Sequence, residues 1–365
     1  MRVSSRNGRS GRLLAARAAL LVAGLVVGLL VAEASVRLLG VDAGIHVIYR
    51  ENFRLSDNPV LKYELQPGSP DGRFQINRAG MRDDEYSPNK PDDTYRIVVL
   101  GDSVGYGLTV AQDQAFPQQL ERLLNAEAAG GTSQRRYEVL NLGVSGYNIE
   151  QIVERGRVLG VPYEPDLIIY AYSLNDPQTF SLELQGLSAM REKAQEVYTP
   201  KRSALRWLSH SRVFMLIWRA FQEPWTRPVK PARQSPDYLA VVSGRHADYF
   251  GALHSGEGWQ RVQNGFSEFV EIREDAKSRP RILVAVLPMY LGPGPHYPLS
   301  ALHQKILGEA SRQGLETLDL APAFIGKGEN TGATEFNDPF HPSPAGHRRA
   351  AAGLLRWLQE SGPRD

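Results

Sequence analysis

The chain of 365 residues contains no cysteine. This absence excludes disulfide bonds, thiolate metal sites and cysteine nucleophiles. The formal net charge is only +2, so nothing in the overall charge balance indicates a nucleic-acid partner. The sequence has no internal repeat, and its histidines show no spacing with carboxylates that is typical of metal ligands. We therefore predict neither a metal nor an organic cofactor.

Long apolar runs are also scarce, and the single clear one lies at the N-terminus. The stretch from Leu13 to Ala32 has 20 residues, and Arg17 is its only charged side chain. That length is sufficient to span a bilayer if Arg17 reaches back to the headgroups. Further arginines precede the stretch, which predicts a cytoplasmic N-terminus and an exported body. Residues 1–40 are thus expected to form a basic tail and a membrane anchor.

A cleaved signal peptide is the alternative for this segment. Ala32-Glu33-Ala34 has the small-x-small form of a cleavage site. We favour the uncleaved anchor because the helical pattern continues through Leu39. Either outcome leaves the body of the protein outside the cytoplasm, in the periplasm or an equivalent space.

Residues 41–95 are predicted to form an extension that packs on the main domain and contains one or two hairpins. Two short segments, 61–65 and 73–77, alternate between polar and apolar residues. The segment between them, Pro67 to Gly72, is rich in proline and glycine, which is typical of a turn.

Residues 96–365 alternate between apolar strands and amphipathic helices. The predicted strands are Arg96–Leu100, Tyr137–Leu142, Asp166–Ala171, Arg281–Leu287 and Leu315–Leu320. The predicted helices are Phe116–Ala128, Ile149–Leu159, Trp259–Asp275, Ser300–Gln313 and Pro344–Gln359. The strands lack clean polar alternation, as expected when both faces of a parallel sheet are covered. The pattern predicts a three-layer, doubly wound α/β domain with a five-stranded parallel sheet of the flavodoxin-like kind.

A helical insertion is predicted at about residues 177–280, where a short connection would suffice. Within it, Ala204 to Phe221 has the spacing of an amphipathic helix, and Glu223 to Asp237 has the composition of a loop. We favour a helix packed on the sheet or at the domain edge. A lid over the site, or a helix on the membrane near the anchor, stays open.

Four polar motifs follow the predicted strands or precede the last helix. Gly101-Asp102-Ser103 follows the first strand, and the segment 141–148 follows the second. Ser173-Leu174-Asn175-Asp176 follows the third strand, and Asp338-Pro339-Phe340-His341 precedes the final helix. Ligand sites of open parallel sheets lie at the carboxyl ends of the strands, so these motifs are expected to meet there.

The residue types in these motifs indicate nucleophilic catalysis. Serine becomes a nucleophile when a histidine takes its proton, and a carboxylate orients the imidazole. We predict Ser103 as nucleophile, His341 as base and Asp338 as the orienting acid. Hydrolysis or transfer of an ester is the chemistry that this set favours.

From Tyr95 to Leu358 the chain resembles the SGNH, or GDSL-type, hydrolase superfamily of esterases, lipases and carbohydrate deacylases. The resemblance implies an oxyanion hole made by Ser103 N–H, Gly146 N–H and the Asn175 amide, with Gly143 as the alternative glycine. Two positions depart from the usual pattern: Ser173 stands where a glycine is common, and Val104 where leucine is common. A serine at position 173 is expected to narrow the pocket slightly.

The segment Asn77 to Arg82 also looks like a subgroup of membrane-anchored bacterial members of the superfamily. We expect Arg82 to form a structural ion pair, with contact to an anionic substrate as the alternative. His347 is expected to be structural, and Asp102 to support the serine turn.

We predict a membrane-anchored, extracytoplasmic serine esterase that cleaves an acyl ester on a carbohydrate or cell-envelope substrate, with acetyl as the expected acyl group. An O-acyltransferase that acts on an exported polysaccharide with the same residues is the first alternative. A catalytically idle, carbohydrate-binding scaffold is the second.

Overall fold

The computed structural model describes residues 7–39, 48–49, 53–68, 70–71, 74–130, 135–189, 211–222, 236–291, 297–324 and 334–362. The chain divides into two compact units, each of which is built from two segments of the sequence. The smaller unit contains residues 1–47 and 188–229, and the larger contains residues 48–187 and 230–365. Part of the predicted insertion therefore groups with the N-terminal helix rather than with the α/β body.

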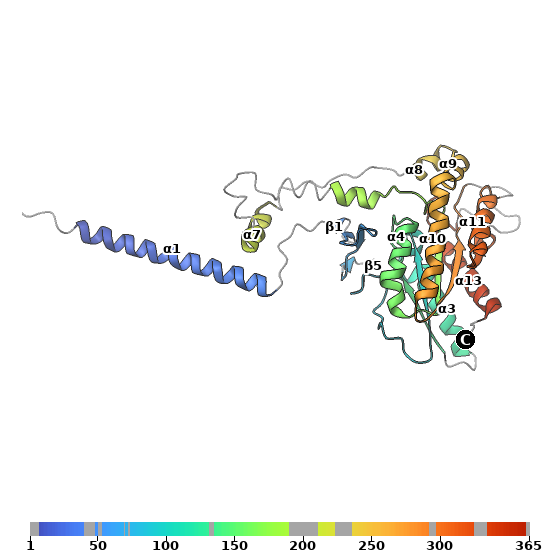
Figure 1. The fold of residues 1–365 in the computed structure, drawn as a ribbon, viewed down its shortest axis with the longest axis horizontal. Helices are drawn as coiled ribbons and strands as arrows, with labels where there is room; N and C mark the ends of the chain where they lie inside the picture. The colour runs from blue at the N-terminus through green and yellow to red at the C-terminus, as the bar shows by residue number, and fades with distance from the viewer. Residues whose placement is uncertain are drawn as a thin grey trace, which may run out of the picture. The chain divides into compact units, whose positions relative to one another are not determined.

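The larger unit is built around a five-stranded parallel sheet (Figure 1). Its strands are β6 (Thr94–Gly101), β7 (Arg136–Asn141), β8 (Leu167–Tyr172), β9 (Arg281–Val286) and β10 (Glu316–Asp319). They are ordered β10-β9-β8-β6-β7 and all neighbours run parallel. This confirms the predicted doubly wound α/β fold, and each predicted strand forms within two residues of its expected bounds. The chain reverses its direction of winding between β6 and β8, which is where such folds place their ligands.

Two helices cover one face of the sheet, α3 (Phe116–Gly130) and α13 (Pro344–Ser361). Ile97 and Val99 of β6 pack with Leu120 and Leu354 of these helices in one buried cluster. Because side chains alternate across a strand, Val98 and Leu100 point to the other face.

On that other face lie α4 (Ile149–Arg155) and α10 (Gly256–Asp275), side by side in Figure 1. The helix predicted to run to Leu159 ends at Arg155 and continues as a π-helical turn, Gly156–Gly160. A Cβ atom at Gly156 would lie 2.7 Å from Leu100 Cδ1, so glycine lets this turn approach the sheet closely. The larger unit also contains α8 (Pro236–Val242), α9 (His246–Leu253), α11 (Ser300–Arg312) and α12 (Ala321–Phe324).

The segment before β6 forms short antiparallel strands in a different pairing from the expected one. β3 (Tyr63–Leu65) pairs with β2 (Phe53–Leu55), which pairs with β1 (Ile48–Tyr49). β5 (Phe74–Gln75) pairs with β4 (Pro70–Asp71). The two alternating segments are therefore not partners, because each finds a nearer strand to pair with.

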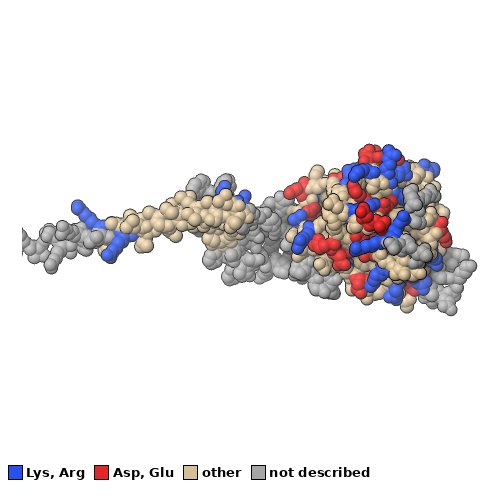
Figure 2. Space-filling model, turned by 90° about the horizontal axis from the view of Figure 1, so that it is seen from below, with Lys and Arg blue, Asp and Glu red and all other residues tan. Residues whose placement is uncertain are grey.

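The smaller unit contains α1 (Asn7–Leu38) and α7 (Arg212–Gln222). Residues Leu14–Leu38 of α1 are long and apolar enough to cross a membrane, and none of this stretch is buried. In Figure 2 this helix is free of acidic and basic side chains over most of its length, whereas the α/β body carries both signs interspersed. The helix predicted over 204–221 is described only from residue 211 onward, and most of the predicted loop 223–237 lies outside the described residues.

Candidate active site

The serine turn begins directly where β6 ends. Asp102 is the N-cap of the short helix α2 (Ser103–Tyr106), and its Oδ1 accepts a hydrogen bond from Val104 N at 2.9 Å. Gly107 ends this helix with φ +80°, a conformation that favours glycine. These caps hold Ser103 at the first position of α2, with its side chain in the pocket described below.

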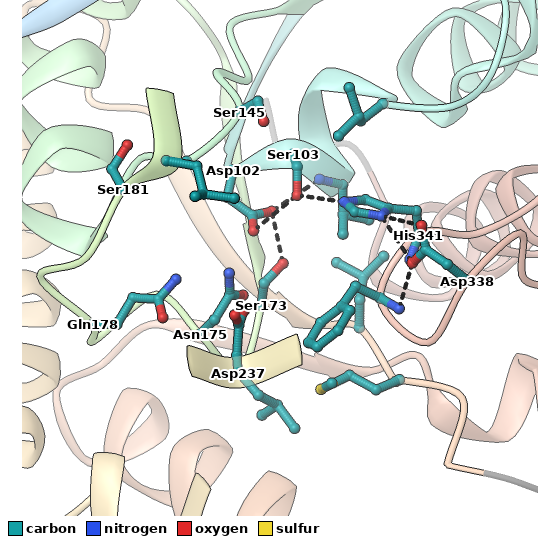
Figure 3. Close-up of a pocket in the computed structure, with 18 of the residues that line it drawn as sticks. Asp102, Ser103, Ser145, Ser173, Asn175, Gln178, Ser181, Asp237, Asp338 and His341 are labelled. Atoms are coloured by element: carbon teal, nitrogen blue, oxygen red, sulfur yellow. Dashed lines mark hydrogen bonds and ion pairs between the residues drawn. The ribbon is translucent and has the colours of Figure 1, made fainter. Parts of the chain in front are cut away.

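Ser103, His341 and Asp338 form a continuous chain of hydrogen bonds (Figure 3). Ser103 Oγ lies 3.0 Å from His341 Nε2, and His341 Nδ1 lies 2.8 Å from Asp338 Oδ2. With the proton of the imidazole on Nδ1, this ring nitrogen donates to Asp338, and Nε2 accepts the proton of the serine. The sequence places the first and last of these residues more than 200 positions apart, and the fold brings them together.

The loop that carries the acid and the histidine is fixed by the acid itself. Asp338 Oδ1 accepts hydrogen bonds from the backbone N–H groups of Phe340 and His341, at 2.9 and 3.0 Å. Burial raises the pKa of the Asp338 carboxyl, but the hydrogen bond and charge of His341, together with these N–H groups, outweigh it and hold the pKa below its usual value. The carboxylate is therefore ionised at neutral pH and can orient the imidazole.

Gly146 and Asn175 line the same pocket as Ser103. Gly146 has φ +77°, and a Cβ atom there would lie only 2.8 Å from the hydroxyl of Tyr63, so a side chain has no room. A Cβ atom at Gly143 would instead lie 2.2 Å from Tyr106 N, and Gly143 is not a lining residue. Gly143 packs closely against the turn that carries Ser103, and this contact explains why the position requires glycine. The structure therefore brings Gly146, and not Gly143, to the pocket.

The pocket has a volume of about 350 Å³ and mixed polar and apolar walls. Its apolar side includes Leu174, Leu287 and Met289, and its polar side includes Gln178 and Ser181. Three carboxylates besides that of Asp338 line it, namely those of Asp102, Glu183 and Asp237, and no Lys or Arg is among the described lining residues. The pocket is thus acidic.

Glu183 is a pocket residue that the sequence motifs do not indicate. Its Oε1 accepts a hydrogen bond from Ser145 Oγ at 2.8 Å, and its Oε2 accepts one from Ser181 Oγ at 3.3 Å. A Cβ atom built on Gly146 would lie 2.1 Å from Glu183 Oε2, so this carboxylate covers the glycine closely. Nothing local in the sequence distinguishes Glu183, because its importance comes from the folding of the predicted insertion over the strand ends.

Asp102 and Ser173 connect the ends of two neighbouring strands, β6 and β8. Ser173 Oγ donates to Asp102 Oδ1 at 2.8 Å, and Figure 3 shows Asp102 bonded to both Ser103 and Ser173. Asp176, also buried, accepts from Ser173 N at 3.0 Å and from Tyr170 OH at 2.6 Å. Burial, reinforced by the charge of Asp102, raises the pKa of the Asp176 carboxyl well above its usual value.

The remaining candidates lie outside the pocket lining. Arg82 is buried and donates to the carbonyl groups of Tyr106, Gly107 and Val110, so it supports the turn that follows α2. His347 is buried on α13, and its Nδ1 accepts from Phe116 N at 3.2 Å. Burial lowers the pKa of His347 to about 3, which keeps it neutral. Among the described residues, no group of three or more potential ligands could hold a metal ion.

Comparison with known proteins identifies the family of the chain. Residues 99–349, more than half of the chain, match the GDSL-like lipase/acylhydrolase family. No curated protein matches the chain.

Among solved structures, the chain is similar to a two-domain esterase active on acetylated mannans, at 13% identity and a TM-score of 0.42. The match covers 74% of this chain and 50% of that one, so the chain spans about half the length of that relative. An acetyl xylan esterase matches at 13% identity, 72% and 99% coverage and a TM-score of 0.38. The lipase/acylhydrolase from Enterococcus faecalis matches at 15% identity, 74% and 99% coverage and a TM-score of 0.41. The family match over residues 99–349 establishes that the chain belongs to the GDSL-like lipase/acylhydrolase family, whose members are ester hydrolases.

Proposed function

We propose that the protein is a membrane-anchored, extracytoplasmic serine esterase that removes small acyl groups, acetyl above all, from hydroxyl groups of a carbohydrate. The observation that carries the proposal is the hydrogen-bonded chain from Ser103 through His341 to Asp338, which opens onto a pocket that also contains Gly146 and Asn175.

The proposed reaction follows from the direction of these hydrogen bonds. Ser103 Oγ attacks the ester carbonyl carbon while its proton passes to His341 Nε2. We assign the stabilisation of the oxyanion that forms to the N–H groups of Ser103 and Gly146 and to the Asn175 amide. His341 then gives the proton to the departing alcohol, which leaves an acyl-serine. Water attacks this ester, His341 takes the proton of the water, and collapse of the second intermediate frees the carboxylic acid and restores Ser103.

The size and polarity of the pocket support a small acyl group. A volume of about 350 Å³ must hold both the acyl group and the part of the alcohol next to it. Glu183, Gln178 and Ser181 offer hydrogen-bonding groups of the kind that sugar hydroxyls use, and the acidic lining disfavours anionic substrates. A neutral or cationic sugar ester fits these walls better than a long-chain lipid.

The proposed location rests on the N-terminal helix. Helix α1 has one apolar stretch of spanning length with arginines on its N-terminal side, which favours a cytoplasmic N-terminus and an exported α/β body. Retention of the helix is supported by a contact between Glu33 and α7 that cleavage after Ala34 would remove.

The test is labelling of the full chain in detergent with a fluorophosphonate probe, together with turnover of p-nitrophenyl esters of increasing acyl length. We expect labelling that Ser103→Ala abolishes and that His341→Ala slows strongly, with acetate turned over faster than octanoate. Ser267→Ala, at an exposed serine on α10, is the matched control and should label normally. Absence of labelling and turnover in protein shown to be folded would contradict the proposal and favour an idle scaffold.

Acetylated oligosaccharides incubated with an unacetylated sugar acceptor distinguish the two chemistries of this site. Release of free acetate supports the esterase. Acetate that appears on the acceptor instead would assign the same residues to an O-acyltransferase.

A further inference from the structure

We infer that α7 lies in the headgroup region of the membrane beside the anchor, with its apolar side against lipid and its first turn fixed by Glu33. The partner of the apolar side of α7 is thus the lipid bilayer. The inference rests on the proposed membrane anchoring, and it adds a second, separate contact between the insertion and the lipid.

Glu33 marks the end of the apolar run of α1. The stretch from Ala18 to Ala32 carries no charge, and Glu33 is the first charged side chain after it. From Leu14 to Glu33 the helix rises about 30 Å, which is the thickness of the hydrocarbon core. A bilayer that covers the apolar stretch therefore ends close to Glu33, at the boundary with the headgroups.

The same carboxylate caps the start of α7. Glu33 Oε2 accepts hydrogen bonds from Ser211 Oγ at 2.9 Å and from Val213 N at 3.0 Å, and Oε1 accepts from Arg212 N at 3.1 Å. N–H groups in the first turn of a helix have no partner within the helix, so this cap satisfies donors that lipid could not. Arg37 on α1 also donates to Glu33, at 2.7 Å, and balances its charge. The first turn of α7 is therefore held at the depth of Glu33.

The distribution of apolar and basic residues on α7 fits a position at the headgroup boundary. At about 100° per residue, Val213, Phe214 and Ile217 share one side of the helix, and Arg212 lies on the other. Ile217 is 51% exposed, which is unfavourable in water and favourable against acyl chains. Helices with one apolar side and a basic opposite side lie in the interface, buried about 5–10 Å at the boundary of headgroups and acyl chains. This placement agrees with the membrane alternative for the amphipathic segment rather than with a helix packed on the sheet.

Because the chain has no cysteine, single cysteines can report the depth of each position. The full chain is reconstituted into phosphatidylcholine vesicles with one-fifth phosphatidylglycerol, and Ile217→Cys, Arg212→Cys, Val26→Cys and Ser267→Cys are each labelled with the fluorophore NBD. Quenching is measured with lipids that carry a nitroxide near the headgroup or deep in the acyl chain, and with iodide in the water.

We expect the shallow nitroxide to quench Ile217→Cys at least about twofold more than Arg212→Cys, because the two positions lie on opposite sides of α7. Val26→Cys, in the middle of the anchor, should be quenched by the deep nitroxide, and Ser267→Cys on the α/β body by iodide alone. Equal quenching at positions 217 and 212, or quenching of Ile217→Cys by iodide alone, would overturn the inference. Loss of lipid quenching at Val26→Cys would instead contradict the proposed anchoring.

The role of Glu33 is tested in the same assay. Glu33→Ala removes the cap, so the lipid quenching at position 217 should fall while that at position 26 stays unchanged. Glu33→Gln keeps a side-chain oxygen acceptor and should retain most of the signal. Unchanged quenching in Glu33→Ala would overturn the assignment of Glu33 as the residue that holds α7 at the interface.

Discussion

Ser173 Oγ donates a hydrogen bond of 2.8 Å to Asp102 Oδ1, and this bond joins the ends of β8 and β6 beside Ser103, the proposed nucleophile. Both side chains are buried. Asp102 Oδ2 also lies 3.3 Å from Ser103 Oγ, so Asp102 and His341 Nε2 compete for the single hydroxyl proton of Ser103. By supplying a donor to Asp102, Ser173 favours the arrangement in which Ser103 donates to His341. We therefore predict that Ser173 helps to orient the hydroxyl group of Ser103.

Ser173→Ala should lower kcat about three- to tenfold with little change in KM, because Asp102 then holds the Ser103 hydroxyl more strongly. Ser173→Thr keeps the hydroxyl and should retain more activity than the alanine variant. The measurement is steady-state hydrolysis of p-nitrophenyl acetate, with thermal unfolding as the check on folding. A kcat of the alanine variant equal to that of the wild type would show that Ser173 has no positioning role.

Asp338→Asn separates the two tasks of the acid. An asparagine oxygen can still accept from the N–H groups of Phe340 and His341, so the loop should keep its shape. It cannot hold the imidazole as a carboxylate does, and kcat should fall by about 10²- to 10⁴-fold. Asp338→Ala removes both functions and should also lower the midpoint of thermal unfolding. If Asp338→Asn retained half of the activity, another group would have to orient His341.

Glu183→Gln should raise kcat for neutral acetyl esters severalfold. The carboxylate covers Gly146, whose N–H is proposed to bind the oxyanion, and a negative charge there opposes the charge of the transition state. The glutamine oxygen can still accept the hydrogen bond from Ser145, and its NH2 group can donate to Ser181 Oγ, so the side chain keeps both partners while it loses the charge. The same substitution should raise KM for a cationic ester such as acetylcholine relative to its neutral carbon analogue. Equal effects on both esters would exclude a role of this charge in selecting the substrate.

The sequence predicts the sheet and the ends of its strands well, because continuous apolar runs such as Ile97 to Leu100 are typical of parallel strands that are covered on both faces. It also indicates Ser103, Asn175, Asp338 and His341, since each follows a strand or precedes the last helix and fits a known set of motifs. The fold places all four around one pocket. Their roles stay predictions until activity is measured.

The contacts between segments that are distant in the sequence could not be predicted from it. Glu183 reaches Gly146 only because the chain after β8 folds back over the strand ends. The pairing of β3 with β2 depends on a competition between short strands that local alternation does not decide. The hydrogen bonds between Glu33 and α7 join residues about 180 positions apart, and neither segment contains a motif that predicts this contact.

Asp83 should make the folded protein less stable as the pH rises. Burial raises the pKa of its carboxyl from 3.8 to about 7, even though the N–H groups of Asn141 and Asp84 donate to it and lower the pKa. Between about pH 4 and 7 the folded protein keeps a proton that the unfolded chain has released, so the free energy of unfolding falls with rising pH, by at most about 1.4 kcal/mol per pH unit. Above about pH 7 both states are ionised and this contribution is constant.

Asp83→Asn cannot ionise, so the drop in its unfolding midpoint between pH 5 and pH 8 should be smaller than in the wild type. Asp84→Asn, at the exposed neighbouring carboxylate, is the matched control and should show the same drop as the wild type. The measurement is thermal unfolding of the full chain in one detergent at both values of pH. Identical pH dependence in Asp83→Asn and wild type would show that Asp83 ionises normally in the folded protein.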